Sequence, residues 1–268
     1  MPNTLFSNRD LKILIFPLVV EQILSMLVGM VDTVMVSYAG EAAISGVALV
    51  DMINYLFITV FSSIATGGAV IVSQYLGDRQ KEQANLAAGQ LYTISALISG
   101  VIAGICLLGH KQILILLYGS VEADVMAASV TYFAITALSF PFLGLYNAAA
   151  ALFRSMKKTN VTMYVSLLMN AINVVGNAIG IFVLKAGVAG VAVPTLIARA
   201  VAAIAMTVLA LNTNNPVAIR WKDIFAWHGD MIRRILKIAI PIGVENGLFA
   251  LGKVLVVSII SLFGTVQI

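Results

Sequence analysis

The stretch from Pro17 to Gly40 reads PLVVEQILSMLVGMVDTVMVSYAG. It is long and apolar enough to cross a bilayer as a helix, yet it carries two carboxylates, Glu21 and Asp32. They are eleven residues apart, so they share one helix face and lie about 16 Å from each other along the axis. A carboxylate in a membrane span is costly and usually faces a bundle interior or a water-filled cavity. We therefore expect this helix to turn an acidic face toward the inside of a bundle.

The same pattern recurs near the other end of the chain. Residues 241–264 read PIGVENGLFALGKVLVVSIISLFG. At a constant offset of 224, without a gap, Pro17 matches Pro241, Glu21 matches Glu245, Ser37 matches Ser261 and Gly40 matches Gly264. Such a repeat predicts two lobes built alike. Since the chain ends soon after the second copy, we expect it to be the first part of a longer, two-lobed protein.

The composition is that of a chain whose solvent is lipid. Of the 268 residues, 60% are hydrophobic and only 10% are charged, whereas soluble domains average about 25% charged residues. The mean hydropathy is +1.01. The single cysteine, Cys106, excludes a disulfide within the chain. The sequence therefore predicts an all-α integral membrane protein.

Hydrophobic runs separated by turn residues or charges predict seven membrane spans. Their limits are 11–37, 46–76, 88–109, 123–149, 161–184, 188–211 and 237–262. The first six form one lobe, over residues 1–211. Residues 212–236 are predicted as an interfacial linker helix on the cytoplasmic side, and residues 237–268 as the first helix of a truncated second lobe.

The placement of Lys and Arg predicts the orientation, because cytoplasmic loops carry an excess of both. With the N-terminus in the cytoplasm, only Lys111 and Lys185 fall outside, and Arg199 and Lys253 fall within spans. The other twelve lie inside: Arg9, Lys12, Arg79, Lys81, Arg154, Lys157, Lys158, Arg220, Lys222, Arg233, Arg234 and Lys237. We expect a multi-pass protein of the cell inner or plasma membrane with a cytoplasmic N-terminus.

The linker itself mixes aromatic, aliphatic and basic residues, NPVAIRWKDIFAWHGDMIRRILK over 215–237. This pattern is typical of a helix that lies on a membrane surface. Trp221, Trp227, Lys222 and Arg233 are the expected headgroup anchors.

Polar residues within the spans gather at one depth. Asp32 lies in the outer half of the first span, and the topology brings Asn173, Asn177 and Thr195 to a similar depth. Oxygen ligands suit a hard cation such as Na⁺. A buried carboxylate can instead take up and release a proton near neutral pH. The residues thus predict a cation-coupling site around Asp32, with H⁺ and Na⁺ both open.

Four other polar residues are candidates for the same cavity. Asp51 and Asn54 lie near the outer end of the second span, and Glu21 and Glu245 lie nearer the cytoplasmic side. Each has an equally simple structural explanation, because polar side chains also hold membrane helices together. Prolines at 17, 141, 194 and 241 are expected to bend their helices.

Several classes of protein are excluded by missing motifs. The chain has no GxxxxGK[ST] phosphate loop, no HExxH motif and no Cys/His cluster. These absences argue against an ATP-driven pump and a metalloenzyme. We therefore expect a transporter rather than an enzyme, with no cofactor beyond a coupling ion. The basic residues follow the cytoplasmic loops and require no nucleic acid.

Three segments resemble the multidrug and toxic compound extrusion (MATE) transporters. The run GMVDTVMVSYAGEAAISGVAL, 29–49, is similar to their first-helix signature. GGAVIVSQYLGDRQKEQA, 67–84, is similar to the turn after their second helix, and Asn173 to Asn177 with GVAGVAVPTLIAR, 187–199, resembles their fifth and sixth helices. The resemblance covers nearly the whole chain.

The resemblance implies twelve helices in two six-helix lobes, and export of organic cations or lipophilic drugs in exchange for H⁺ or Na⁺ by a monomer. It implies that Asp32 binds the coupling cation beside Asn173, Asn177 and Thr195, and that Glu245 occupies an acidic position used by the Na⁺-coupled branch. In one departure from the family, this chain has Asn177 where some members carry Asp. This weakens a strict Na⁺ site and leaves H⁺ coupling open.

Two other functions remain as alternatives. A lipid-linked oligosaccharide flippase of the same superfamily would need several cations in its cavity to hold a pyrophosphate, and only Arg199 and Lys253 are available. A membrane-embedded enzyme or a scaffold is the other alternative. An enzyme should show a compact polar triad, and a scaffold should tolerate loss of Asp32.

Overall fold

The computed structural model describes residues 8–261, and within that range all regular structure is helical. The helices are α1 (Asn8–Ser37), α2 (Glu41–Gly77), α3 (Lys81–Tyr118), α4 (Ala123–Leu138), α5 (Phe140–Ser155), α6 (Thr159–Ala178), α7 (Ala189–Ala210), α8 (Trp221–Phe225) and α9 (Gly229–Ser261). A π-helical turn, Ile179–Val183, continues α6. Residues 1–7 of the predicted first lobe and residues 262–268 of the predicted last helix, including Gly264 of the repeat, lie outside the described residues.

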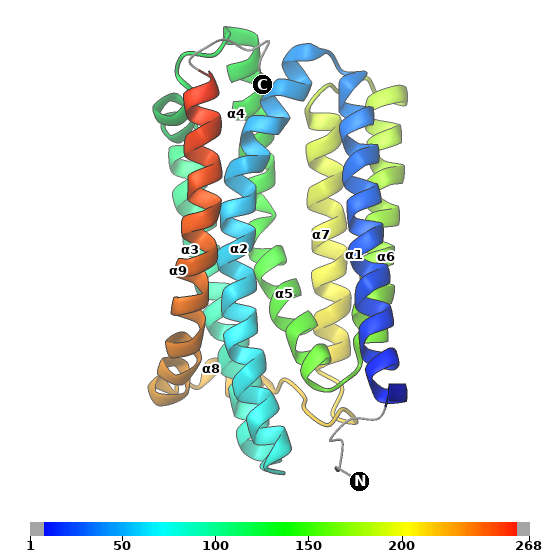
Figure 1. Cartoon of the computed structure of the whole chain (residues 1–268), viewed down its shortest axis with the longest axis vertical. Coiled ribbons are helices and arrows are strands. Elements are labelled where there is room, and N and C mark those ends of the chain that lie inside the picture. Colours follow the sequence, from blue (N-terminus) through cyan, green and yellow to red (C-terminus); the bar gives the residue numbers. More distant parts are fainter. Residues whose placement is uncertain (1–7, 262–268) are drawn as a thin grey trace.

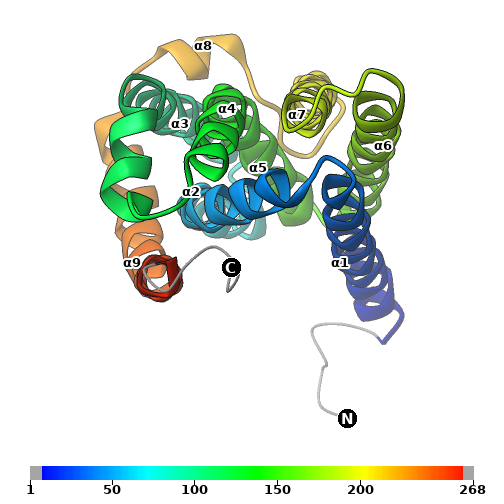
Figure 2. The same cartoon turned by 90° about the horizontal axis from the view of Figure 1, so that it is seen from above.

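The long helices run side by side along the longest axis of the molecule (Figure 1). α1 packs mainly against α6, whereas α9 packs along α2 and α3. Seen from above, α5 occupies the middle of the bundle (Figure 2). We call the lower end in Figure 1 the basic end, because it carries Arg79, Lys81, Lys157, Lys158 and Arg233; the opposite end is the far end.

The central position of α5 follows from its sequence. The run Ala148–Ala151 is at most 2% exposed, so this helix is buried on every side. Small side chains let neighbouring helices approach its backbone closely. An uninterrupted alanine run in an apolar helix therefore marks the middle of the bundle rather than a lipid-facing surface.

The structure contains six of the predicted spans as single helices, and a seventh if a bent pair of helices is taken as one span. The single helices are long and apolar enough to cross a membrane, and the bent pair is α4 and α5, which meet at a bend of 47°. Ser139 lies at the break and Pro141 near the start of α5. Proline lacks the N–H that would continue the helix and its ring clashes with the preceding turn, which explains the bend.

α3 is longer at both ends than the sequence predicted. It begins at Lys81 and ends at Tyr118, so residues 81–87 and 110–118, predicted as breaks, are helical. Lys, Glu, Gln, Ala and Leu are good helix formers. The charged residues that interrupt the hydrophobic run therefore do not mark the ends of this helix.

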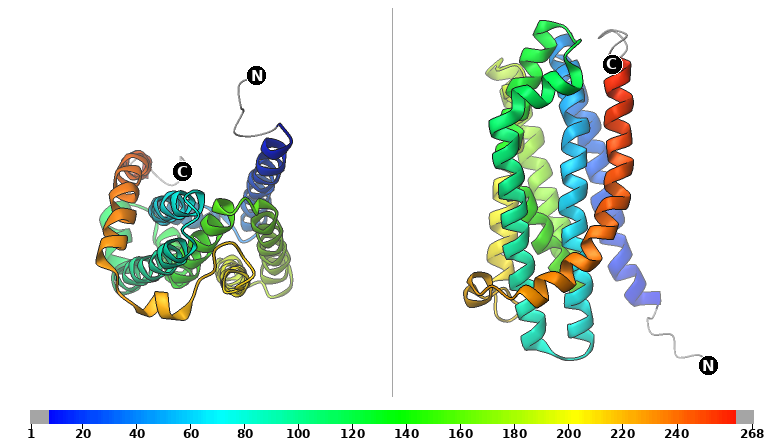
Figure 3. Two further views of the ribbon diagram at one scale, coloured as in Figure 1. Left: turned by 90° about the horizontal axis from the view of Figure 1, so that it is seen from below. Right: turned by 90° about the vertical axis from the view of Figure 1, so that its left-hand side faces the viewer.

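The predicted linker helix over 212–236 is not one helix. Residues 212–220 are irregular, α8 has only five residues, and α9 already begins at Gly229. α9 then continues through Pro241 into the last span, and Figure 3 shows it changing direction along its length. The amphipathic pattern of 229–237 thus belongs to the first turns of the seventh spanning helix.

The irregular linker is held against α3 by side chains that bond its backbone. Gln90, fully buried, donates from Nε2 to the carbonyl oxygens of Asp223 (2.6 Å) and Ala226 (2.5 Å), and its Oε1 accepts from the His228 N–H (3.0 Å). Thr93 Oγ1 donates to the Ile224 carbonyl oxygen at 2.6 Å. Within the described chain, α3 therefore fixes the path by which the sixth span leads to α9.

α6 and α7 meet along a seam of small residues. A Cβ atom added to Gly180 would lie 2.1 Å from the Gly190 carbonyl oxygen, and one added to Gly176 would lie 2.6 Å from Pro194 Cβ. Each helix contributes two residues spaced four apart, hence on one face. Close backbone packing of this kind is how membrane helices associate tightly.

Replacing Gly180 with alanine is expected to lower stability by about 1–3 kcal/mol, the usual cost of overpacking. The added methyl group meets backbone, which cannot rotate away. The measurement is the apparent melting temperature of the purified chain in detergent. Gly104→Ala is the matched control, since a Cβ there meets nothing within 4 Å; an equal loss in both variants would contradict the seam.

Candidate functional site

Asp32 lies where α1, α6 and α7 meet, in the half of the bundle nearer the far end. Its side chain is half-buried. Asn177 Nδ2 donates to Asp32 Oδ1 at 2.8 Å, and Asn173 lies one helical turn away on the same face of α6. Thr195, on α7, is the partner of Asn173 at 2.9 Å. The structure thus brings together the four residues that the sequence placed at one depth.

The Asn173 amide satisfies its surroundings in one orientation. In it, Nδ2 donates to Asp32 Oδ1 (3.0 Å) and Oδ2 (2.9 Å), and Oδ1 accepts from Thr195 Oγ1 (2.9 Å). The reverse orientation would set Asn173 Oδ1 against the carboxylate oxygens, which are also acceptors.

The Asn177 side chain is fully buried, and its Oδ1 is unsatisfied within the described residues. A buried amide oxygen without a partner is costly. It lies on the same amide whose nitrogen bonds Asp32. This oxygen is therefore a second acceptor at the site.

A second polar group lies on the neighbouring helices. Asp51, on α2, accepts hydrogen bonds from Asn54 Nδ2 (3.3 Å) and from the Tyr132 hydroxyl (3.2 Å) on α4. Asn54 and Tyr132 are buried, whereas Asp51 is exposed on its open side. α1, which carries Asp32, packs against α2, which carries Asp51, and we call the two groups together the polar cluster.

Arg199 supplies the positive charge of this cluster. Its Nη1 donates to Ser139 Oγ at 2.7 Å, at the bend between α4 and α5. Its charge acts on both Asp51 and Tyr132. The sequence singled out Arg199 but not its partner, and it missed Tyr132 and Ser139. Tyr132 could have been found as a tyrosine within an apolar run, because a buried hydroxyl group needs a hydrogen-bond partner.

The two glutamates of the repeat lie apart from Asp32. Glu21 is half-buried between α1 and α6, where it accepts from Thr162 Oγ1 at 3.3 Å. Glu245 is exposed on α9, which packs against α2 and α3 rather than α6 or α7. In the part of the chain that the structure describes, Glu245 therefore does not join the Asp32 cluster.

The donors and acceptors of the cluster define its chemistry. Carboxylate, amide and hydroxyl groups can exchange protons or bind a small cation. Across residues 8–261, three or more His, Cys, Asp or Glu side chains nowhere gather closely enough to hold a metal ion. The arrangement suits reversible binding of a cation.

Comparison with known proteins places the chain in a family. The MatE family model matches residues 17–179, from the first helix to the end of α6. The chain belongs to the MATE family. Among the described residues, six single helices and one bent pair are long and apolar enough to cross a membrane, which agrees with a transporter family of this kind. The chain is thus a multi-pass membrane protein.

The chain spans about half the length of the curated relatives it matches. It is 35% identical over 261 residues to "Uncharacterized transporter YisQ" of Bacillus subtilis, covering 94% of this chain and 55% of that protein. It is 24% identical over 262 residues to "Probable multidrug resistance protein NorM" of Thermotoga maritima, covering 96% of this chain and 55% of that protein.

Solved structures share the fold. An outward-facing multidrug resistance MATE family transporter matches with a TM-score of 0.82 and 19% identity, over 88% of this chain and 52% of that one. An inward-facing conformation matches with a TM-score of 0.76 and 20% identity, over the same shares. The six-helix lobe and α9 therefore follow the MATE arrangement.

Proposed function

We propose that this MATE chain acts as the N-terminal lobe, with the first helix of the second lobe, of a secondary active antiporter. The antiporter exports cationic or lipophilic drugs in exchange for a cation that binds at Asp32. Residues 1–211 form the lobe, and residues from 237 on begin its partner. The family, the relatives named as probable multidrug resistance proteins and the hydrogen-bonded group around the half-buried Asp32 support this function.

The observation that carries the proposal is the pair of amide donors around Asp32. An ionised Asp32 accepts from Asn177 and from Asn173. If Asp32 took up a proton, a rotation of the Asn173 amide would let its Oδ1 accept from the carboxyl group and its Nδ2 donate to Thr195 Oγ1. Because Asp32, Asn173 and Thr195 would then keep partners in both charge states, the site could gain or lose a proton at little cost. This favours H⁺ as the coupling ion.

Na⁺ is the second candidate, and one observation favours it. The unsatisfied Asn177 Oδ1 and the Asp32 carboxylate offer oxygen ligands on neighbouring helices. Against it, both amide nitrogens point at the carboxylate in its ionised arrangement and occupy the positions a metal ion would take. We therefore place H⁺ first.

Transport would follow from competition between the coupling ion and the drug. A cation bound at Asp32 neutralises the cluster and lowers its affinity for a cationic substrate. Since linkage is reciprocal, a bound substrate lowers the affinity for the cation by the same factor. Entry of one then drives exit of the other. The protein would face the cytoplasm at its basic end, where most Lys and Arg lie.

A flippase for pyrophosphate-linked lipids is not favoured. Arg199 is engaged with Ser139 inside the bundle. Lys253 lies on α9, its Nζ 4.8 Å from the centre of the Tyr55 ring and 4.9 Å from that of Phe249. The two intramembrane cations thus sit on different helices with different partners and do not form one anion site.

The test is ethidium efflux from membrane vesicles that carry the two-lobed protein, with Na⁺ and pH gradients imposed separately. We expect efflux to follow the pH gradient and to ignore the Na⁺ gradient. Efflux driven by Na⁺ alone would transfer the coupling to Na⁺ and to Asn177 Oδ1 as a ligand. If neither gradient moved the dye, drug antiport would be wrong.

A further inference from the structure

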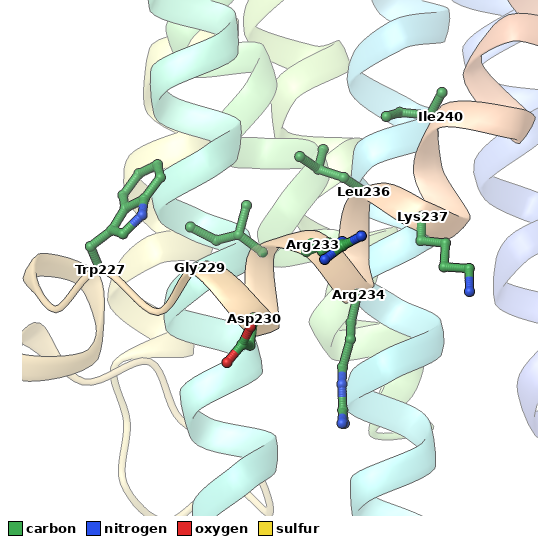
Figure 4. Close-up of a pocket in the computed structure, with 9 residues that line it drawn as sticks. Trp227, Gly229, Asp230, Arg233, Arg234, Leu236, Lys237 and Ile240 are labelled. Atoms are coloured by element: carbon green, nitrogen blue, oxygen red, sulfur yellow. The ribbon is translucent and has the colours of Figure 1, made fainter.

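The first turns of α9, Gly229–Ile240, and the preceding Trp227 line an open pocket of about 840 Å³. Its polar lining residues are Asp230, Arg233, Arg234 and Lys237. In Figure 4 the Arg234 and Lys237 side chains extend downward, toward the basic end, and Leu236 and Ile240 lie above them. Two of the basic side chains of the pocket thus extend toward the basic end, and two of its apolar side chains lie on the opposite side of them (Figure 4).

The cations of this pocket are not equally engaged. Arg234 Nη1 donates to the Tyr75 hydroxyl on α2 at 2.7 Å. Arg233 and Lys237 are exposed, and within residues 8–261 neither forms a hydrogen bond or an ion pair. They are four residues apart, so they lie on one helix face. Three cations against the single carboxylate of Asp230 leave the pocket complementary to an anion.

An apolar groove of about 310 Å³ lies between α2, α3 and α9, next to this pocket. The pocket and the groove share Leu236 and Ile240. Apart from Ser63, the remaining lining of the groove is apolar or glycine: Val60, Ile64, Ile98, Ala239, Gly243 and Val244. Its size and lining suit a hydrocarbon chain.

We propose that this combined site binds one anionic phospholipid of the leaflet at the basic end. Arg233 and Lys237 hold its phosphate, the Trp227 indole lies at headgroup level, and one acyl chain occupies the groove. Trp at the membrane interface and basic residues beside anionic headgroups are both favourable. A free anion would satisfy the cations but leave the adjoining groove unexplained. The bound lipid would brace α9 against α2 below Pro241.

The test uses the chain in nanodiscs, with phosphatidylglycerol or phosphatidylcholine that carries brominated acyl chains. Trp221→Phe leaves Trp227 as the only tryptophan of the chain, and bromine quenches a nearby indole. We expect phosphatidylglycerol to quench Trp227 at a lower mole fraction than phosphatidylcholine. Arg233→Gln and Lys237→Gln should each weaken this preference about fivefold, the usual worth of one cation at an anionic membrane surface.

Matched variants separate this site from general surface charge. Lys81→Gln removes an exposed cation from the α2–α3 turn at the same end and should leave the preference unchanged. Gly243→Leu should fill the groove and weaken quenching by both lipids, because a Cβ there already contacts Ser63 at 3.5 Å. Gly247→Leu should leave quenching by both lipids unchanged, because a Cβ there meets nothing within 4 Å.

Three results would overturn the proposal. Equal quenching by the two lipids would remove the headgroup site. Loss of the preference on adding inorganic phosphate at constant ionic strength would make the site one for a soluble anion. Loss of bound phosphatidylglycerol in native mass spectra of the two-lobed protein, but not of this chain, would show that the second lobe covers the groove.

Discussion

Replacing Asp32 with asparagine is expected to reduce drug efflux by the two-lobed protein to the rate of vesicles without it. Asparagine has nearly the same shape, so Asn177 and Asn173 keep a partner of similar size. It cannot change its charge, however, and the competition between cation and substrate depends on that change. A second readout is proton release when substrate is added to detergent-purified protein, which the variant should lose.

Glu41→Gln is the control for this substitution. Glu41 is an exposed acid at the first residue of α2, near the same end of the bundle but outside the polar cluster. Drug efflux and proton release by the Glu41→Gln variant should match those of the unaltered protein. Normal export by Asp32→Asn would instead make Asp32 a structural residue and move the coupling to Asp51 or Glu21.

Replacing Gln90 with methionine is expected to detach the linker from α3. Methionine keeps the length of the side chain but leaves two backbone carbonyls and one backbone N–H of residues 223–228 without their partner. The buried Asp223 carbonyl costs about 1–3 kcal/mol when it loses its hydrogen bond. The other two hydrogen bonds are part-buried, and the Ala226 carbonyl also contacts His228 Nδ1, so their loss costs less. We therefore expect a loss of about 2 kcal/mol or more, seen as a fall of roughly 4–8 °C in the apparent melting temperature in detergent.

Gln83→Met makes the same chemical change on the same helix at an exposed position, and should leave the melting temperature within about 1 °C. Hydrogen exchange adds a direct readout, since amides of 218–228 should lose protection in Gln90→Met while those of α5 keep it. Unchanged exchange would show that α8 is held by other contacts, such as the ion pairs from Arg220 to Glu82 (2.7 Å) and to Asp223 (2.5 Å).

The spans were predictable because the bilayer imposes a length and an apolar composition that the sequence displays directly. Counting residues from the ends of the predicted spans also gave the depth of Asp32 relative to Asn173, Asn177 and Thr195, because each residue adds about 1.5 Å along a helix. The family resemblance pointed to the same residues, and the family match covers the helices that carry Asp32, Asn173 and Asn177.

Contacts between helices that are far apart in the chain could not be predicted from the sequence. The partner of Arg199 is Ser139, sixty residues away, and the Tyr132 hydroxyl reaches Asp51 across two helices. Such hydrogen-bonded pairs depend on how far each helix is rotated about its own axis, and the packing of neighbouring helices determines that rotation. The linker was misjudged for a related reason, because its irregular backbone is stabilised by Gln90 rather than by its own periodicity.

The amino-acid sequence by itself thus determined that the chain spans a membrane, how often, and which polar residues share a depth. These properties depend on local composition and helix geometry. Only the tertiary structure decided which of those residues touch, how α4 and α5 bend around Arg199, and that the amphipathic stretch begins α9 beside an apolar groove. Those properties depend on close packing between helices, such as the contact of Gly180 with Gly190, which no single segment encodes.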